Sequence, residues 1–303
     1  MVVPVYFNEG SLKALHQRLN EIASTLIDRG ISLEMVFVDD GSGDSSFSIL
    51  REIAAADSRV RVVRHARNFG SFPAIKTGLS VASGDCAVTL SADLQDPPEL
   101  LLDMVARWQD GEKFVIAVRA SREDPLGSRM FSAAYYRILR WLVIPDYPPG
   151  GFDFMLVDRL CVPYLLSGPK SVNLNLYAYW LGFKPSILPY DRLVREHGKS
   201  RWTLRKKVNL FVDTITGFSV RPIRIMSVFG LGTAALSFLY GLYVVLQTLL
   251  VGSTQPGFPT LAALVSFFSG LIIFMLGMIG EYLWRIFDAV NRKPEAVIAE
   301  VIK

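Results

Sequence analysis

The chain has 303 residues, of which 51% are hydrophobic and 20% are charged, and its formal net charge is +4. Several of the excess cations lie beside apolar segments near the C-terminus, which argues against nucleic-acid binding and for anionic headgroups or a phosphorylated lipid. The two cysteines, Cys86 and Cys161, have no CxxC spacing, so we expect them to be reduced structural residues, consistent with a cytosolic location.

The N-terminal half alternates short apolar runs with longer amphipathic runs. We expect strands at 2–6, 35–38, 61–63, 86–90 and 114–118, and helices between them at 12–27, 47–56, 72–81 and 100–108. This alternation predicts an α/β fold, in which a mostly parallel sheet carries helices on both faces. Ligands of such sheets bind beyond the carboxyl ends of the strands, so the functional residues are expected just after each strand.

Polar motifs follow four of the expected strands. They are Asn8-Glu9, Asp39-Asp40-Gly41-Ser42, Arg67-Asn68-Phe69-Gly70 and the segment 91–98. Asp96, which precedes two prolines, could instead be a helix N-cap, and the Asp39 motif could be a turn. Together the motifs predict a nucleotide and metal crevice, because carboxylate and amide oxygens suit Mg²⁺ or Mn²⁺. The absence of GxxxxGK and GxGxxG sequences after any strand argues against a P-loop NTPase and a dinucleotide oxidoreductase.

An amphipathic segment precedes the apolar part of the chain. One helical face of residues 203–217 collects apolar side chains, namely Leu204, Val208, Phe211, Val212 and Ile215. We expect this helix to lie in the membrane interface, although a connecting helix packed on the domain is the alternative. Arg221-Pro222-Ile223-Arg224 is expected to end it.

Residues 225–280 contain no Asp, Glu, Lys, Arg or His. The turn sequence at 252–259 divides them into apolar helices at 225–250 and 260–283, each long enough for a hydrocarbon core of about 30 Å. A buried hairpin of a soluble core is the alternative, and a channel or transporter is disfavoured because the hairpin carries no charge. Cations flank both outer ends but not the turn, so both termini are expected to be cytoplasmic, with no signal peptide.

Six short motifs together resemble family 2 glycosyltransferases of the GT-A fold. They are the residues at 3–9, 38–42, 68–70, 92–99, 151–154 and 198–202. With the hairpin, the chain is most similar to the polyprenyl-phosphate branch, which includes dolichol-phosphate mannose synthases and bactoprenol glucosyltransferases. This resemblance implies a Rossmann-like GT-A domain at 1–200, an interfacial segment at 201–224, a transmembrane hairpin at 225–284, a cytoplasmic tail at 285–303, and assembly into a tetramer.

The resemblance also implies a role for each matched residue. The base and ribose of a nucleotide sugar would contact Pro4, Tyr6, Glu9, Asp39 and Asp40, and Asn68 would also bind the nucleotide sugar. Asp93 and Gln95 would hold Mg²⁺ or Mn²⁺ on the diphosphate, and Arg201 would close over that diphosphate. The acceptor phosphate would meet Arg119, Arg129 and Ser132, beside the catalytic aspartate Asp153. From the residues alone, Arg119 and Arg129 could be solvated surface cations, and Asp153 could pair with a neighbouring arginine.

Two positions depart from the family pattern. The usual Asp-x-Asp is Ser91-Ala92-Asp93, which leaves a single-carboxylate metal site or a pseudoenzyme as readings. Met155 follows Asp153-Phe154 where an arginine is commoner.

A processive polysaccharide synthase usually carries Gln-x-x-Arg-Trp, whereas Gly198 stands at the glutamine position here.

A lipid phosphate has a second pKa of about 6, so it is mostly an anionic nucleophile at neutral pH and needs little help from a base. We therefore expect metal-dependent transfer of a sugar, with UDP-glucose the favoured donor, to undecaprenyl phosphate with inversion. A non-catalytic nucleotide-sugar-binding protein and a processive synthase are the alternatives.

Overall fold

The computed structural model describes residues 1–120, 135–170, 172–191, 204–251, 257–291 and 293–303. The chain divides into two compact units, Met1–Asp213 with Lys293–Lys303, and Thr214–Arg292.

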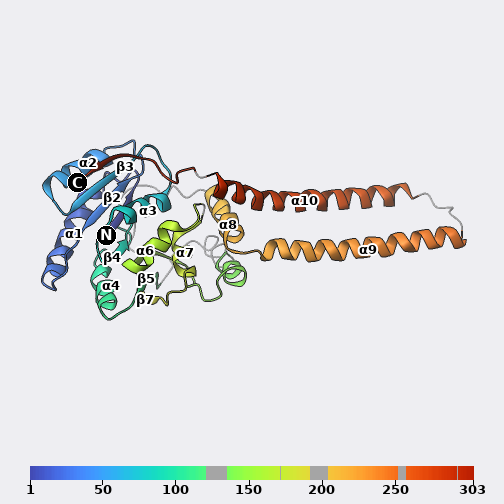
Figure 1. Ribbon diagram of the computed structural model, residues 1–303, viewed down its shortest axis with the longest axis horizontal. Helices are drawn as coiled ribbons and strands as arrows, with labels where there is room; N and C mark the ends of the chain where they lie inside the picture. The colour runs from blue at the N-terminus through green and yellow to red at the C-terminus, as the bar shows by residue number, and fades with distance from the viewer. Residues whose placement is uncertain (121–134, 171, 192–203, 252–256, 292) are drawn as a thin grey trace. The chain divides into compact units, whose positions relative to one another are not determined.

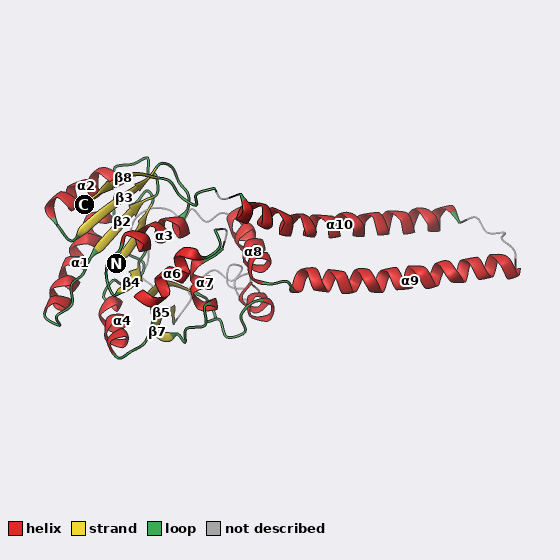
Figure 2. Ribbon diagram, in the orientation of Figure 1, coloured by secondary structure: helices red, strands yellow, loops and turns green. Residues whose placement is uncertain are grey.

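The first unit is built on one mixed sheet (Figures 1 and 2). Its strands are β1 (Val2–Val5), β2 (Met35–Asp39), β3 (Val60–His65), β4 (Cys86–Thr89), β5 (Phe114–Arg119), β6 (Phe152–Asp158), β7 (Ser186–Tyr190) and β8 (Ile298–Ile302). They are ordered β7-β5-β6-β4-β1-β2-β3-β8. Only β6 and β8 run antiparallel to their neighbours, so the expected mostly parallel α/β sheet is confirmed.

The helices of this unit cover both faces of the sheet. They are α1 (Leu12–Ile27), α2 (Ser46–Ala56), α3 (Ser71–Val81), α4 (Leu100–Gln109), α6 (Val162–Ser167) and α7 (Leu174–Trp180). The five strands and four helices expected in the N-terminal half are present within a few residues of the expected bounds. The elements between residues 152 and 190 were not foreseen.

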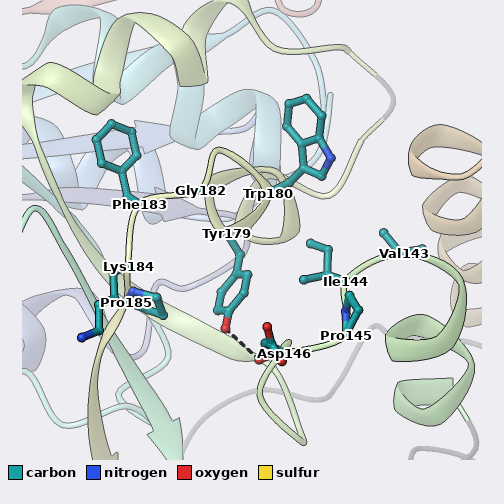
Figure 3. A pocket seen from close by; sticks show the side chains of 10 residues that line it. All are labelled: Val143, Ile144, Pro145, Asp146, Tyr179, Trp180, Gly182, Phe183, Lys184 and Pro185. Atoms are coloured by element: carbon teal, nitrogen blue, oxygen red, sulfur yellow. Dashed lines mark hydrogen bonds between the residues drawn. The ribbon is translucent and has the colours of Figure 1, made fainter.

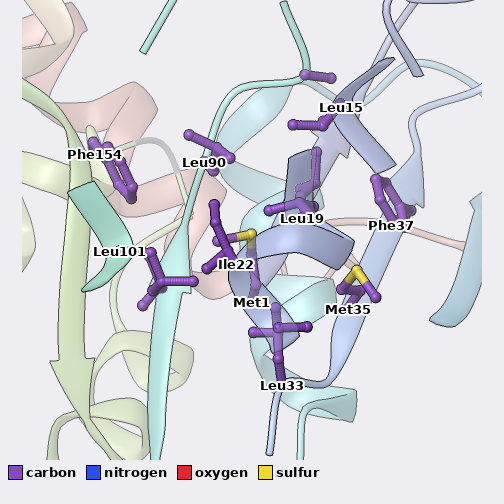
Figure 4. Packing of buried hydrophobic residues seen from close by; sticks show 14 of the residues in the cluster. Met1, Leu15, Leu19, Ile22, Leu33, Met35, Phe37, Leu90, Leu101 and Phe154 are labelled. Atoms are coloured by element: carbon purple, nitrogen blue, oxygen red, sulfur yellow. The ribbon is translucent and has the colours of Figure 1, made fainter. Parts of the chain in front are cut away.

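One apolar core fills the space between the sheet and the helices α1, α2 and α4. Leu15, Leu19 and Ile22 of α1 are buried in the same cluster as Phe37 of β2 and Leu101 of α4 (Figure 4). Helix α3 instead contacts β1, β2 and β3, and its buried side chains lie outside that cluster. Because both faces are covered, the central strands are buried along their whole length, as β2 shows.

The two cysteines lie in this unit as free thiols. Burial raises the pKa of Cys86 and of Cys161 to about 11, so both thiols are protonated at neutral pH.

The C-terminal residues return to the sheet after the apolar helices. Residues 285–303 were expected to be a tail, yet β8 pairs antiparallel with β3, with Val301 opposite Val63. Just before it, the Lys76 ammonium of α3 contacts Glu295 at 2.9 Å, and both side chains are largely buried, at 8% and 21% exposed. Lys76 also donates to the carbonyl of Gly168 at 3.0 Å. The strand and the buried ion pair therefore attach the chain end to the first unit.

The second unit consists mainly of two long helices. They are α9 (Arg221–Val251) and α10 (Phe258–Val290), and they follow α8 (Leu204–Phe218), whose residues up to Asp213 belong to the first unit. The expected helical segment and hairpin are therefore present. The windows Arg221–Val244 and Phe267–Val290 are long and apolar enough to cross a membrane, and neither is buried. Leu231 is 74% exposed and Leu250 is 82% exposed, unlike the residues of a soluble core. The two helices thus indicate membrane association, and the interfacial position of α8 stays a prediction.

Hydrogen bonds within the second unit join α10 to the residues just before α9. The Tyr282 hydroxyl of α10 donates to the Ser219 carbonyl at 2.8 Å, and Arg285 Nε donates to Thr216 Oγ1 at 2.6 Å. Gly230 of α9 faces α10 so closely that a Cβ there would lie 2.9 Å from Met275 Cε. Small side chains at such positions allow helices to approach each other.

Gly78 of α3 lies against β1, and a Cβ at this position would lie 2.2 Å from Val2 Cγ1. We predict that Gly78→Ala lowers the stability of the first unit by about 1–3 kcal/mol, through overpacking. The sign of this change in stability distinguishes a packed position from an exposed one, because replacing glycine by alanine in an exposed helix stabilises it by about 1 kcal/mol. Thermal unfolding of the full chain in detergent measures the change. Ser80→Ala, at an exposed position of the same helix, is the matched control and should leave the midpoint unchanged. An unchanged or raised midpoint for Gly78→Ala would contradict the packing described here.

Candidate active site

The strand directions bring distant residues to one edge of the sheet. β1 to β5 and β7 run the same way, whereas β6 lies between β4 and β5 in the opposite direction. The carboxyl ends of β2, β4, β5 and β7 therefore share an edge with the beginning of β6. Asp39, Asp93, Arg119, Tyr190 and Asp153 stand at or just beyond these strand ends.

Asp39, at the end of β2, is fully buried and incompletely hydrogen-bonded. Its Oδ1 accepts from the Ser42 amide at 3.2 Å, while Arg64 Nε lies 3.5 Å from Oδ2. Within the described residues, Oδ2 accepts no hydrogen bond. Burial raises the pKa of Asp39, against the hydrogen bonds of Ser42 and the charge of Arg64. A buried acceptor of this kind suits a donor such as the N–H of a nucleotide base.

Asp40 faces the interior of the protein. Its carboxylate accepts from the amides of Phe69 and Gly70 at 2.8 and 2.7 Å, and lies 2.8 Å from His65 Nδ1. These contacts hold the loop that carries the exposed Asn68. The predicted contact of Asp40 with a nucleotide stays a prediction, and its described partners are all protein groups.

The predicted residues in and just after β1 lie near a contact between two loops. The exposed Glu9 accepts from the Ser45 amide at 2.9 Å, which ties the loop after β1 to the loop after β2. Tyr6 and Pro4 are half-buried. The geometry thus gives Glu9 a defined structural role, while its predicted nucleotide contact stays a prediction.

Ser91 occupies the centre of a carboxylate network after β4. Its hydroxyl lies 2.9 Å from Asp93 Oδ1 and 3.0 Å from Asp96 Oδ2, so one proton is shared between two carboxylates. The Tyr190 hydroxyl donates to Asp96 Oδ1 at 2.6 Å. Asp96 is only 1% exposed, so an acidic side chain at position 91 would add a third negative charge beside it. The serine therefore fits this site electrostatically.

Asp96 does not cap a helix, so that alternative reading is wrong. Helix α4 begins at Leu100 with Glu99 at its N-cap, and Asp96 is instead a buried acceptor. Burial raises the pKa of its partner Tyr190, and the negative charge of Asp96 raises it further, while Arg119 opposes the shift. Tyr190 hence remains a protonated donor at neutral pH.

Asp153 is the extra residue of a β-bulge. Ala117 of β5 pairs with Phe154 of β6, but Val118 pairs with Phe152, so Asp153 has no opposite residue. Its neighbours Phe152 and Phe154 are buried, whereas the Asp153 side chain is 56% exposed. Bulges next to active sites commonly redirect a side chain in this manner.

Arg119 binds Asp153 directly, with 2.5 Å between Nη2 and Oδ2. The arginine side chain is 20% exposed, so it is not a solvated surface cation. The Arg119 charge also acts on Tyr190 and Asp96, so the Asp153 pair lies beside the Asp96 network. The alternative reading of Asp153, pairing with a neighbouring arginine, is what the structure shows. Arg129, Ser132 and Arg201 lie outside the described residues.

The residues predicted to hold a metal adjoin each other at the Asp93 loop. The Gln95 amide N–H donates to Asp93 Oδ1 at 3.2 Å. In the described part of the chain, no group of three or more His, Cys, Asp or Glu side chains could hold a metal. One carboxylate and one amide oxygen still fit Mg²⁺, which commonly takes one or two carboxylates and completes its shell with substrate phosphates and water.

Two of the pockets formed by described residues of the first unit bear on the site. One of about 160 Å³ is lined by Arg119, Asp153, Tyr147, Phe152 and Asn175, among others. A larger one of about 340 Å³ lies beside α7, where the Tyr179 hydroxyl donates to the Asp146 carbonyl at 2.7 Å (Figure 3). None of the sequence-predicted residues that the structure describes lines the larger pocket. The smaller pocket is therefore the one associated with the candidate site.

Both units match known protein families. Residues 1–155 match the family model for glycosyl transferase family 2, and residues 221–286 match the model of the GtrB C-terminal hairpin. The glycosyltransferase YkcC of Bacillus subtilis is 36% identical, over 98% of this chain and 92% of its own length. The SfII prophage-derived bactoprenol glucosyl transferase of Shigella flexneri is 31% identical, over 98% and 96%. A prophage bactoprenol glucosyl transferase homolog of Escherichia coli is 30% identical, over 100% and 99%.

Removing the Tyr190 hydroxyl should lower the stability of the protein, because the buried carboxylate of Asp96 loses a donor. In Tyr190→Phe, Asp96 Oδ1 loses the donor at 2.6 Å, so we predict a loss of about 1–3 kcal/mol in unfolding free energy. Thermal or urea unfolding in detergent measures it. Tyr164→Phe, at a side chain that is 56% exposed, is the control and should behave as wild type. Equal stability of the two variants would show that Tyr190 does not support Asp96.

Proposed function

Because this chain belongs to glycosyl transferase family 2, we propose that it transfers a sugar from a nucleotide-sugar donor to a polyprenyl phosphate at a membrane. Relatives that align over nearly the whole chain are named bactoprenol glucosyl transferases, and they support the lipid acceptor. The observation that carries the proposal is the Arg119–Asp153 pair at the same sheet edge as Asp93. The apolar helices α9 and α10 supply the means of membrane attachment.

The acceptor phosphate is the group that Arg119 would receive. With a second pKa of about 6, the phosphate is mostly a dianion at neutral pH and attacks without a strong base. The planar Arg119 guanidinium has five N–H donors along its edges, so it can donate to Asp153 and to a phosphate oxygen at the same time. Asp153 would then orient the arginine and the acceptor, and would take a residual proton.

The donor would lie across the ends of β2 and β4. Asp39 Oδ2 would accept a hydrogen bond from the base, and Asp93 with Gln95 would hold Mg²⁺ or Mn²⁺. The divalent ion would neutralise charge on the departing nucleoside diphosphate, with Arg201 closing over the same group. Attack opposite the leaving group gives inversion, hence a β-linked product from an α-linked donor.

The finer assignments follow from the same proposal. UDP-glucose is the favoured donor and undecaprenyl phosphate the acceptor. The catalytic domain and both termini would be cytoplasmic, and the protein would assemble as a homo-oligomer, a tetramer by analogy with its branch. The Ser91 hydrogen bonds to Asp93 support a single-carboxylate metal site in preference to a pseudoenzyme, since they hold the retained aspartate in place.

Turnover of defined substrates tests the proposal. Purified full-length protein is incubated with undecaprenyl phosphate, Mg²⁺ or Mn²⁺, and a panel of nucleotide sugars, and the glycolipid is identified by mass. We expect a hexosyl lipid from UDP-glucose, and no product after the metal is removed with a chelator. If no donor yields a glycolipid while an authentic enzyme works in parallel, the catalytic proposal is wrong.

Substitution of the two acids locates the chemistry. Asp153→Asn and Asp93→Asn should each lower kcat/KM by about 10²–10⁴-fold, the usual contribution of a positioned acid–base or electrostatic group. Asp146→Asn, in the larger pocket, is the control and should retain activity. A near-normal rate for either of the first two variants would remove that residue from the site.

A further inference from the structure

The smaller pocket has the size and lining of a site for one sugar ring. Its volume is about 160 Å³, below the range of roughly 300–1,000 Å³ that holds drug-sized ligands. It therefore suits a single small ring better than a whole nucleotide. Arg119 and Asp153 share its wall with aromatic rings, which belong to Phe72, Tyr135, Tyr136, Tyr147 and Phe152.

Asn175 contributes a buried acceptor to this wall. Its side chain is 6% exposed, and Nδ2 donates to the Phe152 carbonyl at 2.8 Å. That contact fixes the amide orientation, because a flipped amide would place two oxygen acceptors together. Among the described residues, no group donates to Asn175 Oδ1. A buried acceptor left in this state is unfavourable, and a ligand that donates a hydrogen bond to it would remove that cost.

Two other polar groups of the pocket are hydrogen-bonded within the protein. The Tyr136 hydroxyl donates to the Gly150 carbonyl at 2.6 Å, and Asn173 Oδ1 accepts from the Leu176 amide at 3.1 Å. Gly151, at φ 68°, passes so close that a Cβ would lie 2.6 Å from the Tyr136 oxygen. These contacts make a preformed wall in which Asn175 Oδ1 is the buried atom that still needs a donor.

The chemistry of the substrates decides which of them supplies the donor. An ionised phosphate has no proton to donate, and an isoprenoid chain has no polar hydrogen. A sugar carries several hydroxyl groups, and its C–H faces can pack against the negative faces of aromatic rings. We propose that this pocket binds the transferred sugar and that Asn175 Oδ1 accepts a hydrogen bond from one of its hydroxyls. This inference rests on the proposed function, and it makes Asn175 a specificity-determining residue.

Deoxygenated donors test the hydrogen bond directly. Wild type and Asn175→Leu are assayed with the preferred nucleotide sugar and with analogues that each lack one sugar hydroxyl. In wild type, one analogue should lose about tenfold or more in kcat/KM, as expected for one lost hydrogen bond to a buried group. In Asn175→Leu that analogue and the parent donor should be used equally well. A merely structural role of Asn175 would lower kcat/KM by the same factor for every donor.

Two further variants keep the result interpretable. Asp146→Asn, in the larger pocket, should keep the wild-type pattern of analogue discrimination. Asn175→Ala is the second substitution if the leucine variant misfolds, and UDP binding to each variant reports the integrity of the donor site. Equal discrimination by wild type and Asn175 variants, or none in wild type, would overturn the inference while leaving the proposed function intact. A wild-type protein that makes no glycolipid would overturn the proposed function, and this inference with it.

Discussion

The reversed direction of β6 is the constraint on which the site depends. A carboxylate can reach the carboxyl-end edge of a parallel sheet from the end of a forward strand or from the start of a reversed one. This chain uses the second route, because β6 lies between β4 and β5 and begins where they end. The bulge at Asp153 then exposes one carboxylate between two buried phenylalanines. Strand order and one irregular residue thereby place Asp153 beside Arg119.

Polar groups from the two halves of that edge lie next to one another. Asp153 pairs with Arg119, whose charge acts on Tyr190 and Asp96. Tyr190 donates to Asp96, and Ser91 hydrogen-bonds both Asp96 and Asp93. Buried carboxylates are costly unless each is supplied with donors, and Asp96 has a tyrosine and a serine. Position 91 is therefore constrained by its buried neighbour as well as by any metal. The family motif Asp-x-Asp alone does not show that a buried aspartate lies beside position 91.

The N-terminal half could be predicted from sequence because each element carries its own pattern. Alternating apolar and amphipathic runs gave α1 to α4 and the strands β1 to β5, and strand direction gave the edge where Asp39, Asp93 and Arg119 stand. Asp96 was less predictable, because Asp-Pro-Pro is locally typical of a cap and its partner Tyr190 is 94 residues away. Asn175 had no sequence signal, since its role arises from an unmet acceptor in a folded wall. Residues 298–302 are a short apolar run that becomes a strand only where the edge of β3 is available.

The pairing of β8 with β3 sets an order on biosynthesis. β3 precedes the apolar helices in the chain and β8 follows them, so the edge of β3 lacks this partner until α9 and α10 have left the ribosome. Open strand edges invite pairing with other chains. A nascent protein that stalls within the hairpin therefore leaves this edge of β3 without β8. Completion of the sheet coincides with delivery of the helices, so a finished catalytic unit always carries its anchor.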